Sequence, residues 1–295
     1  MTMSNLVRVT LISFLAYAVM SGMLAQIGIL ITPISQHFDR EATVVSNQFS
    51  WLTVGILVGA VISLFIFDYV KIKTLNLLVF TAIFLAILGF YVVDVYRVNA
   101  ILLGIIGTGC GVALPAAAVV ISRVYTPARR ATMLVITDAS FSLSGTLCTA
   151  LVVVYLANGL HWSSGYSTVA ALALITLVLT ACSNFPEVPQ EERQDFRQEL
   201  ATWPMGIYLC MLALLIYLTG QNFILMWLPS YAQQVISMSA SDAGSLISNF
   251  WAGMLGGQLI AAAILIKAAT RTIALLAAIL TAFSTMPLWL VDQPA

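Results

Sequence analysis

The chain has 295 residues, of which 61% are hydrophobic and only 8% are charged. Soluble domains carry about 25% charged residues, so this composition excludes an ordinary water-soluble protein. Twelve basic and twelve acidic residues give a formal net charge of zero, which leaves no electrostatic case for binding nucleic acid.

Nine long apolar stretches follow one another along the chain, and the charges lie almost only in the gaps between them. The stretches are residues 6–33, 49–67, 74–93, 100–122, 132–157, 166–182, 205–228, 245–266 and 272–291. A helix needs roughly 20 residues to cross the hydrocarbon core of a bilayer, and a helix satisfies its own backbone hydrogen bonds there. The sequence therefore predicts an all-α membrane protein with nine transmembrane helices.

Lysine and arginine are distributed unevenly between alternate gaps, which predicts the orientation of the chain. With the N-terminus inside, two bases fall in outside gaps, Arg40 and Arg97. Ten fall inside: Arg8, Lys71, Lys73, Arg123, Arg129, Arg130, Arg193, Arg197, Lys267 and Arg271. Cytoplasmic loops carry the excess of Lys and Arg, so we expect a multi-pass protein of the bacterial inner membrane with a cytoplasmic N-terminus.

The gap between the sixth and seventh stretches is long and charged. Residues 185–203 read FPEVPQEERQDFRQELATW, and the two prolines break the preceding helix. We interpret this segment as a cytoplasmic linker, with a docking site for a partner as the alternative. It divides the chain into an N-terminal six-helix bundle, residues 1–184, and a partial C-terminal bundle of three helices, residues 204–295.

Small residues recur at helical spacing in several stretches. The second and eighth stretches have similar starts, SNQFSW and SNFW, and each then carries a G-x-x-x-G step. The two helices have the same predicted orientation, so this is a parallel repeat. The fourth stretch has a face of small residues that predicts close helix packing, formed by Gly104, Thr108, Gly111 and Pro115.

Three segments resemble the major facilitator superfamily and, within it, the TsgA-like permeases. They are LVITDASFSLSG at 134–145, WLPSYA at 227–232 and SDAGSLISNFW at 241–251, and the similarity runs along the whole chain. The resemblance implies twelve helices in two six-helix bundles, a central cavity and alternating access. Nine of those twelve helices are accounted for, so the resemblance implies that the sequence is a fragment or a truncated gene product.

The loop after the second stretch departs from the superfamily signature, which is roughly G-x-x-x-D-R-x-G-R-R. Residues 64–73 read LFIFDYVKIK, which keeps an acid at Asp68 and bases at Lys71 and Lys73 but lacks both glycines and the first arginine. Two interpretations are open for these three residues. They form a gating loop, or their charges serve only to orient the chain.

Asp138 is the only charge well inside an apolar stretch, six residues into the fifth. An acid at the bilayer centre costs about 2.5–3.5 kcal/mol on insertion scales. Asp138, Ser142, Gly145 and Thr149 fall at helical spacing and form one polar, small-residue stripe. A low-dielectric site favours the protonated carboxyl, which suits proton carriage. The alternative is an ion pair near the inner surface with one of three bases, Arg123, Arg129 and Arg130.

Amide side chains within the stretches are the other candidates for substrate contact. Gln221 and Asn222 lie in the seventh stretch, Gln26 in the first and Gln258 in the eighth. Amides hydrogen-bond polar solutes, and they also join neighbouring helices, so both roles are open.

Other polar and aromatic residues have structural explanations. Asn249 and Asp242 are expected to cap the eighth helix. Six tryptophans, Trp251 among them, fall near span ends or loops, and an interfacial aromatic belt is expected to explain most of the six. His37 and His161 fall in separate outside loops, where we expect each to be solvated, with no metal site.

Together these features predict a secondary transporter that moves a small solute by alternating access, with a proton carried by Asp138 as the simplest coupling. Its partners are the solute, protons and the lipid bilayer. No cofactor is expected, and no enzyme activity, because the stretches contain no P-loop and no histidine. The alternative is a non-transporting membrane sensor or scaffold, or an inactive truncated permease.

Overall fold

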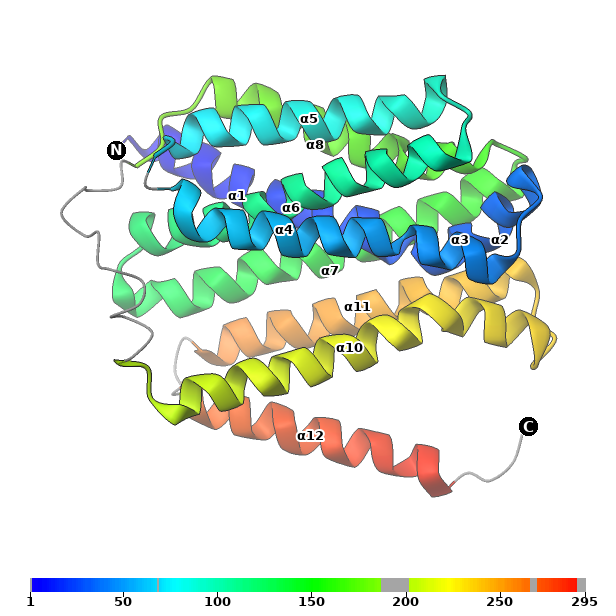
Figure 1. Cartoon of the computed structure of the whole chain (residues 1–295). Coiled ribbons are helices and arrows are strands. Elements are labelled where there is room, and N and C mark those ends of the chain that lie inside the picture. Colours follow the sequence, from blue (N-terminus) through cyan, green and yellow to red (C-terminus); the bar gives the residue numbers. More distant parts are fainter. Residues whose placement is uncertain (1, 68, 187–201, 266–269, 291–295) are drawn as a thin grey trace.

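The structure is a computed structural model that describes residues 2–67, 69–186, 202–265 and 270–290. These ranges are helical throughout apart from short loops, and they contain no strand (Figure 1). Asp68 lies outside the described residues. Residues 187–201, which form most of the predicted linker, lie outside them as well.

The all-helical prediction is confirmed. Eight helical segments of the described ranges are long and apolar enough to cross a membrane, and a further helix occupies the ninth predicted stretch. In chain order the elements are α1 (Met3–Ala25), α2 (Ile27–Phe38), α3 (Ala42–Gln48), α4 (Ser50–Ile66), α5 (Ile72–Val92), α6 (Tyr96–Val124), α7 (Pro127–Ala157), η1 (Trp162–Tyr166), α8 (Ser167–Ala181), α10 (Met205–Gln234), α11 (Ala240–Leu265) and α12 (Thr270–Leu290).

Two predicted helices are broken near the end of the molecule opposite to the N-terminus. The first stretch divides at Gln26, where α1 ends and α2 begins. The Gln26 amide nitrogen donates to the carbonyl oxygen of Gly22 at 2.6 Å, so this side chain competes for the backbone of its own helix. The second stretch extends back to Ala42 and divides at Phe49, between α3 and α4.

Helices α4 and α6 pack backbone against backbone, as their glycines predict. A Cβ atom at Gly59 would overlap the carbonyl oxygen of Thr108 and lie 3.0 Å from the Cα of Gly111. A Cβ at Gly55 would overlap the carbonyl oxygen of Gly104 in the same way. The small-residue face of α6 is therefore a helix contact, and only glycine fits at these points of α4.

Helices α1 to α8 lie around a shared apolar core, to which α10 and α11 add Leu225, Ile247 and Trp251. Helices α10, α11 and α12 lie along one side of the first group (Figure 1). Helix α1 contacts α6, α7 and α8, while α5 contacts α6 and α8. Helix α11 packs along α7, and α10 packs on α11 and α2. Most of α10 is exposed, and its buried residues are Leu225, Pro229 and Ala232.

A set of hydrogen bonds joins the start of the chain to the end of α8, and we call it the α1–α8 clasp. Asn5 donates to the carbonyl oxygen of Asn184 at 2.6 Å and accepts from its backbone N–H at 2.9 Å. Arg8 donates to the carbonyl oxygen of Cys182 at 2.7 Å. Lys73 donates to the carbonyl oxygen of Ala181 at 2.9 Å, so one base of the predicted gating loop stabilises a helix C-terminus.

The start of α11 corrects one capping prediction. The helix begins at Ala240, so Asn249 lies well inside it and cannot cap it. Ser239 occupies the cap position instead. Its hydroxyl accepts from the backbone N–H of Asp242 at 3.1 Å and donates to the Asp242 carboxylate at 2.7 Å. Asp242 therefore contributes to the cap as the acidic member of a capping box.

Candidate functional site

Asp138 lies deeper in the molecule than its sequence position suggested. Helix α7 begins at Pro127, five residues before the predicted stretch, because proline at the first helical position starts the helix there. Asp138 is eleven residues from that end, which is about 17 Å of helix rise. The bases at the start of α7 therefore lie about two turns or more away along the helix axis.

The carboxylate of Asp138 is bonded to an amide of another helix. Gln258 on α11 donates from Nε2 to Oδ2 of Asp138 at 2.5 Å. Within the described ranges no ion pair joins Asp138 to Arg129 or Arg130. The hydrogen bond thus links α7 to α11, between the two groups of helices that the linker separates in sequence.

Polar side chains from four helices surround this bond. Tyr17 on α1 and Tyr217 on α10 lie within electrostatic range of the Asp138 carboxylate. One helical turn further along each element, the same faces carry Ser21, Ser142 and Gln221. We call this group the polar cluster, and its members are Tyr17, Ser21, Asp138, Ser142, Tyr217, Gln221, Trp251 and Gln258.

Gly145 brings Trp251 into the polar cluster. A Cβ at Gly145 would lie 2.7 Å from the indole ring of Trp251 and 3.1 Å from Oγ of Ser21, so α1, α7 and α11 meet at this glycine. The Trp251 side chain is 2% exposed and packs on Phe141, with ring centroids 5.4 Å apart. The expectation of an interfacial belt is therefore wrong for Trp251, because the close approach allowed by Gly145 buries the indole.

Several atoms of the polar cluster are buried without a hydrogen-bond partner in the described structure. They are Oγ of Ser21, Oγ of Ser142, Oε1 of Gln221, Nε1 of Trp251 and Oε1 of Gln258. A buried polar atom left unpaired costs about 1–3 kcal/mol, so most such atoms in proteins are paired. Donors and acceptors gathered in this way can bind the polar groups of a solute.

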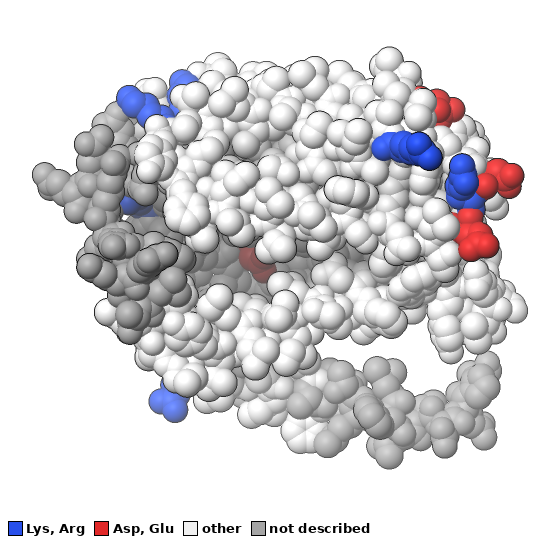
Figure 2. Space-filling view, viewed as in Figure 1, with Lys and Arg blue, Asp and Glu red and all other residues white. Residues whose placement is uncertain are grey.

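The surface beside the polar cluster is hollowed. Figure 2 shows a recess between the first group of helices and α10–α12, with acidic atoms inside it and none on the apolar surface around it. The Asp138 side chain is exposed in the described structure, so it is accessible to water from such a recess. A carboxyl that contacts both solvent and a neighbouring helix can exchange a proton.

Two of the predicted site residues lie apart from the polar cluster. Gln26 is fully buried, and a Cβ at Gly165 of η1 would lie 2.7 Å from its Oε1. Asn222 is exposed and donates to the carbonyl oxygen of Leu218 on its own helix at 2.8 Å. The structure therefore brings Asp138, Ser142 and Gln221 into one region and leaves Gln26 and Asn222 outside it.

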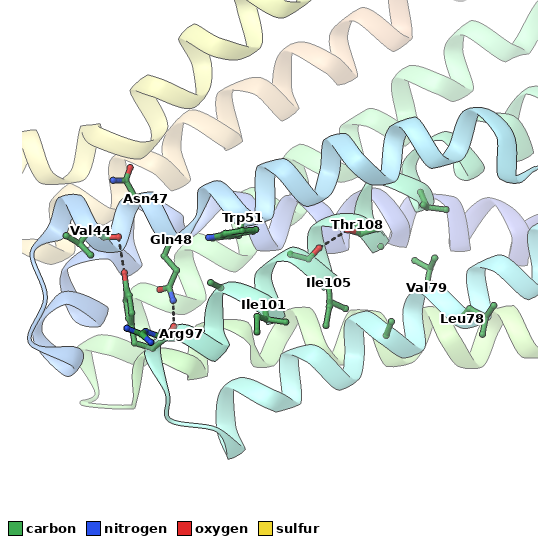
Figure 3. A pocket seen from close by; sticks show the side chains of 16 residues that line it. Val44, Asn47, Gln48, Trp51, Leu78, Val79, Arg97, Ile101, Ile105 and Thr108 are labelled. Carbon is green, nitrogen blue, oxygen red and sulfur yellow. Dashed lines mark hydrogen bonds between the residues drawn. The ribbon is translucent and has the colours of Figure 1, made fainter.

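A second hollow lies elsewhere, between α4, α5 and α6 (Figure 3). Its volume is about 930 Å³, and its walls are mainly apolar, with Trp51, Ile101 and Ile105 among them. Three polar groups in its lining are already bonded to backbone: Gln48 to Tyr96, Tyr96 to Val44 and Thr108 to Gly104. This hollow suits an acyl chain, and the unpaired polar atoms make the polar cluster the better candidate for a solute.

Comparisons with known proteins bear on both groups of helices. Residues 9–294 match the sequence profile described as Major Facilitator Superfamily. The "Protein TsgA homolog" of Edwardsiella ictaluri (strain 93-146) is 30% identical over 261 residues, which is 88% of this chain and 66% of that protein. The "Protein TsgA homolog" of Yersinia pestis (strain Pestoides F) is 28% identical over 259 residues, with the same coverage. The chain thus spans slightly less than two thirds of these relatives.

A solved structure has a similar fold. The crystal structure of a D-xylose-proton symporter matches with a TM-score of 0.67 at 14% sequence identity, over 89% of this chain and 70% of that one. At this identity the likeness concerns the fold alone.

Proposed function

The chain belongs to the Major Facilitator Superfamily, and we propose from this that it moves a small solute across the bacterial inner membrane by alternating access. It is a multi-pass membrane protein of a transporter family. Transport rather than catalysis is the proposed activity, and a proton carried by Asp138 is the proposed coupling ion.

In this proposal residues 1–184 form the N-terminal bundle, residues 185–203 a cytoplasmic linker and residues 204–295 part of the C-terminal bundle. The contacts of α7 with α11 and of α2 with α10 support it, because these are the places where the two groups meet. Alternating access requires such contacts to open and close on opposite sides of a central site.

The observation that carries the proposal is the hydrogen bond between Asp138 and Gln258, with unpaired polar atoms beside it. It joins an ionisable group of one bundle to a polar group of the other. A change in protonation of Asp138 alters this bond, because a protonated carboxyl presents a donor and has less negative charge to attract the amide. Proton binding would thereby bias the contact between the bundles.

Proton flux in proteoliposomes tests the proposed function. The protein is reconstituted in liposomes with a pH-sensitive dye inside, and a panel of sugars, amino acids and organic acids is added in turn. We expect at least one solute to cause a pH change that empty liposomes do not show. A complete absence of solute-dependent flux, with radiolabelled uptake also absent, would favour a non-transporting sensor or scaffold.

The proposed orientation predicts the location of the linker. A green fluorescent reporter fused at Gln190 should fluoresce, because that reporter matures in the cytoplasm, and alkaline phosphatase fused at Gly159 should be active, because that enzyme matures outside. Figure 2 supports this, since the described residues in view at the end of the molecule near the N-terminus show basic colour and no acidic colour. Phosphatase activity at Gln190 would contradict the orientation.

A further inference from the structure

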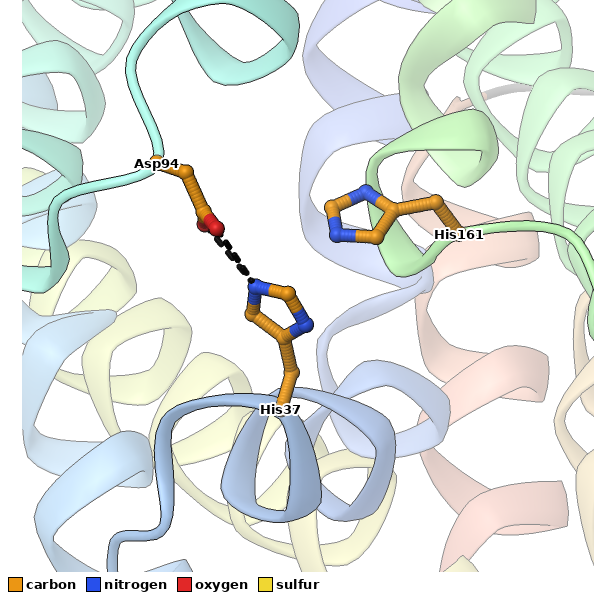
Figure 4. A group of neighbouring side chains, drawn as sticks. All are labelled: His37, Asp94 and His161. Atoms are coloured by element: carbon orange, nitrogen blue, oxygen red, sulfur yellow. Dashed lines mark hydrogen bonds and ion pairs between the residues drawn. The ribbon is translucent and has the colours of Figure 1, made fainter.

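The last turn of one helix and two loops meet at the end of the molecule opposite to the N-terminus and bring together two histidines and an acid (Figure 4). His37 lies in the last turn of α2, Asp94 in the loop between α5 and α6, and His161 in the loop before η1. The sequence-based prediction that each histidine is isolated and solvated is wrong, because the centroids of their rings lie 4.6 Å apart. We call these three residues the histidine cluster.

The three side chains direct their ligating atoms at one another. Nε2 of His37 lies 2.8 Å from Oδ1 and 3.0 Å from Oδ2 of Asp94. One ligating atom from each of the three residues lies within 4.8 Å of the others. The cluster is open to solvent, since the side chains of His37 and Asp94 are 31% and 64% exposed. An ion from the bulk can therefore reach it.

Neighbouring contacts fix the ring of His161. Its Nδ1 lies 2.8 Å from Oγ of Ser163 and accepts the backbone N–H of Ser163 at 3.4 Å, which leaves Nε2 for an ion. The ring also packs on Trp162, with centroids 5.2 Å apart. A metal-binding histidine donates a hydrogen bond from its other ring nitrogen. Coordination through Nε2 therefore places the proton on Nδ1, where Oγ of Ser163 accepts it and replaces the longer contact with the backbone N–H.

We propose that the histidine cluster binds one divalent transition-metal ion, Zn²⁺, through Nε2 of His37, Nε2 of His161 and the carboxylate of Asp94. Two imidazoles and a carboxylate form a common zinc ligand set that leaves a fourth position for water. Bonds of about 2.0–2.1 Å in a tetrahedron place ligand atoms roughly 3.4 Å apart, so the exposed loops must close by about 1–1.5 Å. The bound ion would join the end of α2 to two loops of the N-terminal bundle on the proposed outer side of the membrane.

Metal titration of the purified protein tests the proposal. The protein is purified in detergent through a tag without histidine, and Zn²⁺ affinity is measured by competition with a chromophoric chelator. Co²⁺ serves as the spectroscopic probe, because tetrahedral coordination gives strong visible absorption. We expect one ion per chain, and we expect His161→Ala and Asp94→Asn each to weaken Zn²⁺ binding at least tenfold. Affinity should fall between about pH 7.5 and about pH 5.5, because protons compete for the imidazoles.

Glu41→Gln provides the matched control, since it removes a carboxylate from the same end of the molecule without touching the histidine cluster. It should bind Zn²⁺ as the unaltered protein does. Asp94→Asn keeps the side-chain size and an acceptor for His37, so a fall in its affinity would not reflect misfolding. Binding that is absent, or equally strong in His161→Ala, Asp94→Asn and Glu41→Gln, would overturn the proposal.

Discussion

Replacing Asp138 with asparagine is expected to abolish solute accumulation driven by a pH gradient and to leave exchange of solute across the membrane largely intact. Asparagine keeps the size of the side chain and an oxygen that can accept the hydrogen bond from Gln258. It cannot take up or release a proton. In the proteoliposome assay, solute-dependent proton flux should fall to the level of empty liposomes, while counterflow of labelled against unlabelled solute continues.

The folded yield of this variant separates coupling from a structural role. If Asp138 only neutralised an arginine, Asp138→Asn would leave a buried base without its partner and would lower the yield of folded protein. The bond to Gln258 leads us to expect an unchanged yield. Asp242→Asn is the matched control, because it makes the same change in the capping box of α11 and should transport normally. Gradient-driven accumulation by Asp138→Asn at the unaltered rate would remove this residue from the mechanism.

Gly59→Ala is expected to destabilise the protein markedly, and Gly59→Leu to prevent recovery of folded protein. The added Cβ would overlap the carbonyl oxygen of Thr108, and neither backbone can move without parting α4 from α6. Overpacking a tight contact typically costs about 1–3 kcal/mol, and a Leu side chain adds more. The measurement is the melting temperature in detergent, together with the fraction of monodisperse protein in size-exclusion chromatography.

Gly253→Ala is the control for this prediction, because it makes the same chemical change in the similar G-x-x-x-G step of α11. No heavy atom of the described structure lies within 4 Å of a Cβ at Gly253. Alanine is a better helix former than glycine, so we expect an unchanged or slightly higher melting temperature. Equal losses in Gly59→Ala and Gly253→Ala would show that the α4–α6 contact is not what limits stability.

The sequence predicts the helices well because the lipid bilayer imposes one dominant constraint, which is length. Each apolar stretch becomes a helix for that reason, and the glycines of α4 and α6 correctly mark a close contact. The breaks at Gln26 and Phe49 are missed, since they lie inside apolar segments and depend on local competition for backbone groups. The capping role predicted for Asn249 is wrong because the helix begins at Ala240, nine residues before it, and is capped by Ser239.

The site is predicted less completely, because it depends on contacts between distant parts of the chain. Asp138 stands out in the sequence as an isolated charge, but its partner Gln258 is 120 residues away and looks like any amide in a helix. Tyr17, Ser21 and Tyr217 give no signal, since tyrosine and serine are common in membrane helices. The histidine cluster is likewise invisible, because nothing in the spacing of its three residues relates loops that the fold brings together.

The hydrogen bonds of the α1–α8 clasp cannot form until the end of α8 has been synthesised. The partners Asn5 and Asn184 are separated by 179 residues, and Arg8 and Cys182 by 174. At a translation rate of 5–20 residues per second, roughly 10–40 s pass between synthesis of the first member of each pair and the second. During that interval Arg8 can bond Ser4, four residues before it, but not the carbonyl oxygen of Cys182, which has not yet been synthesised. Carbonyl groups at and just after the C-terminus of α8 therefore hold in place the start of α1, which entered the bilayer earlier.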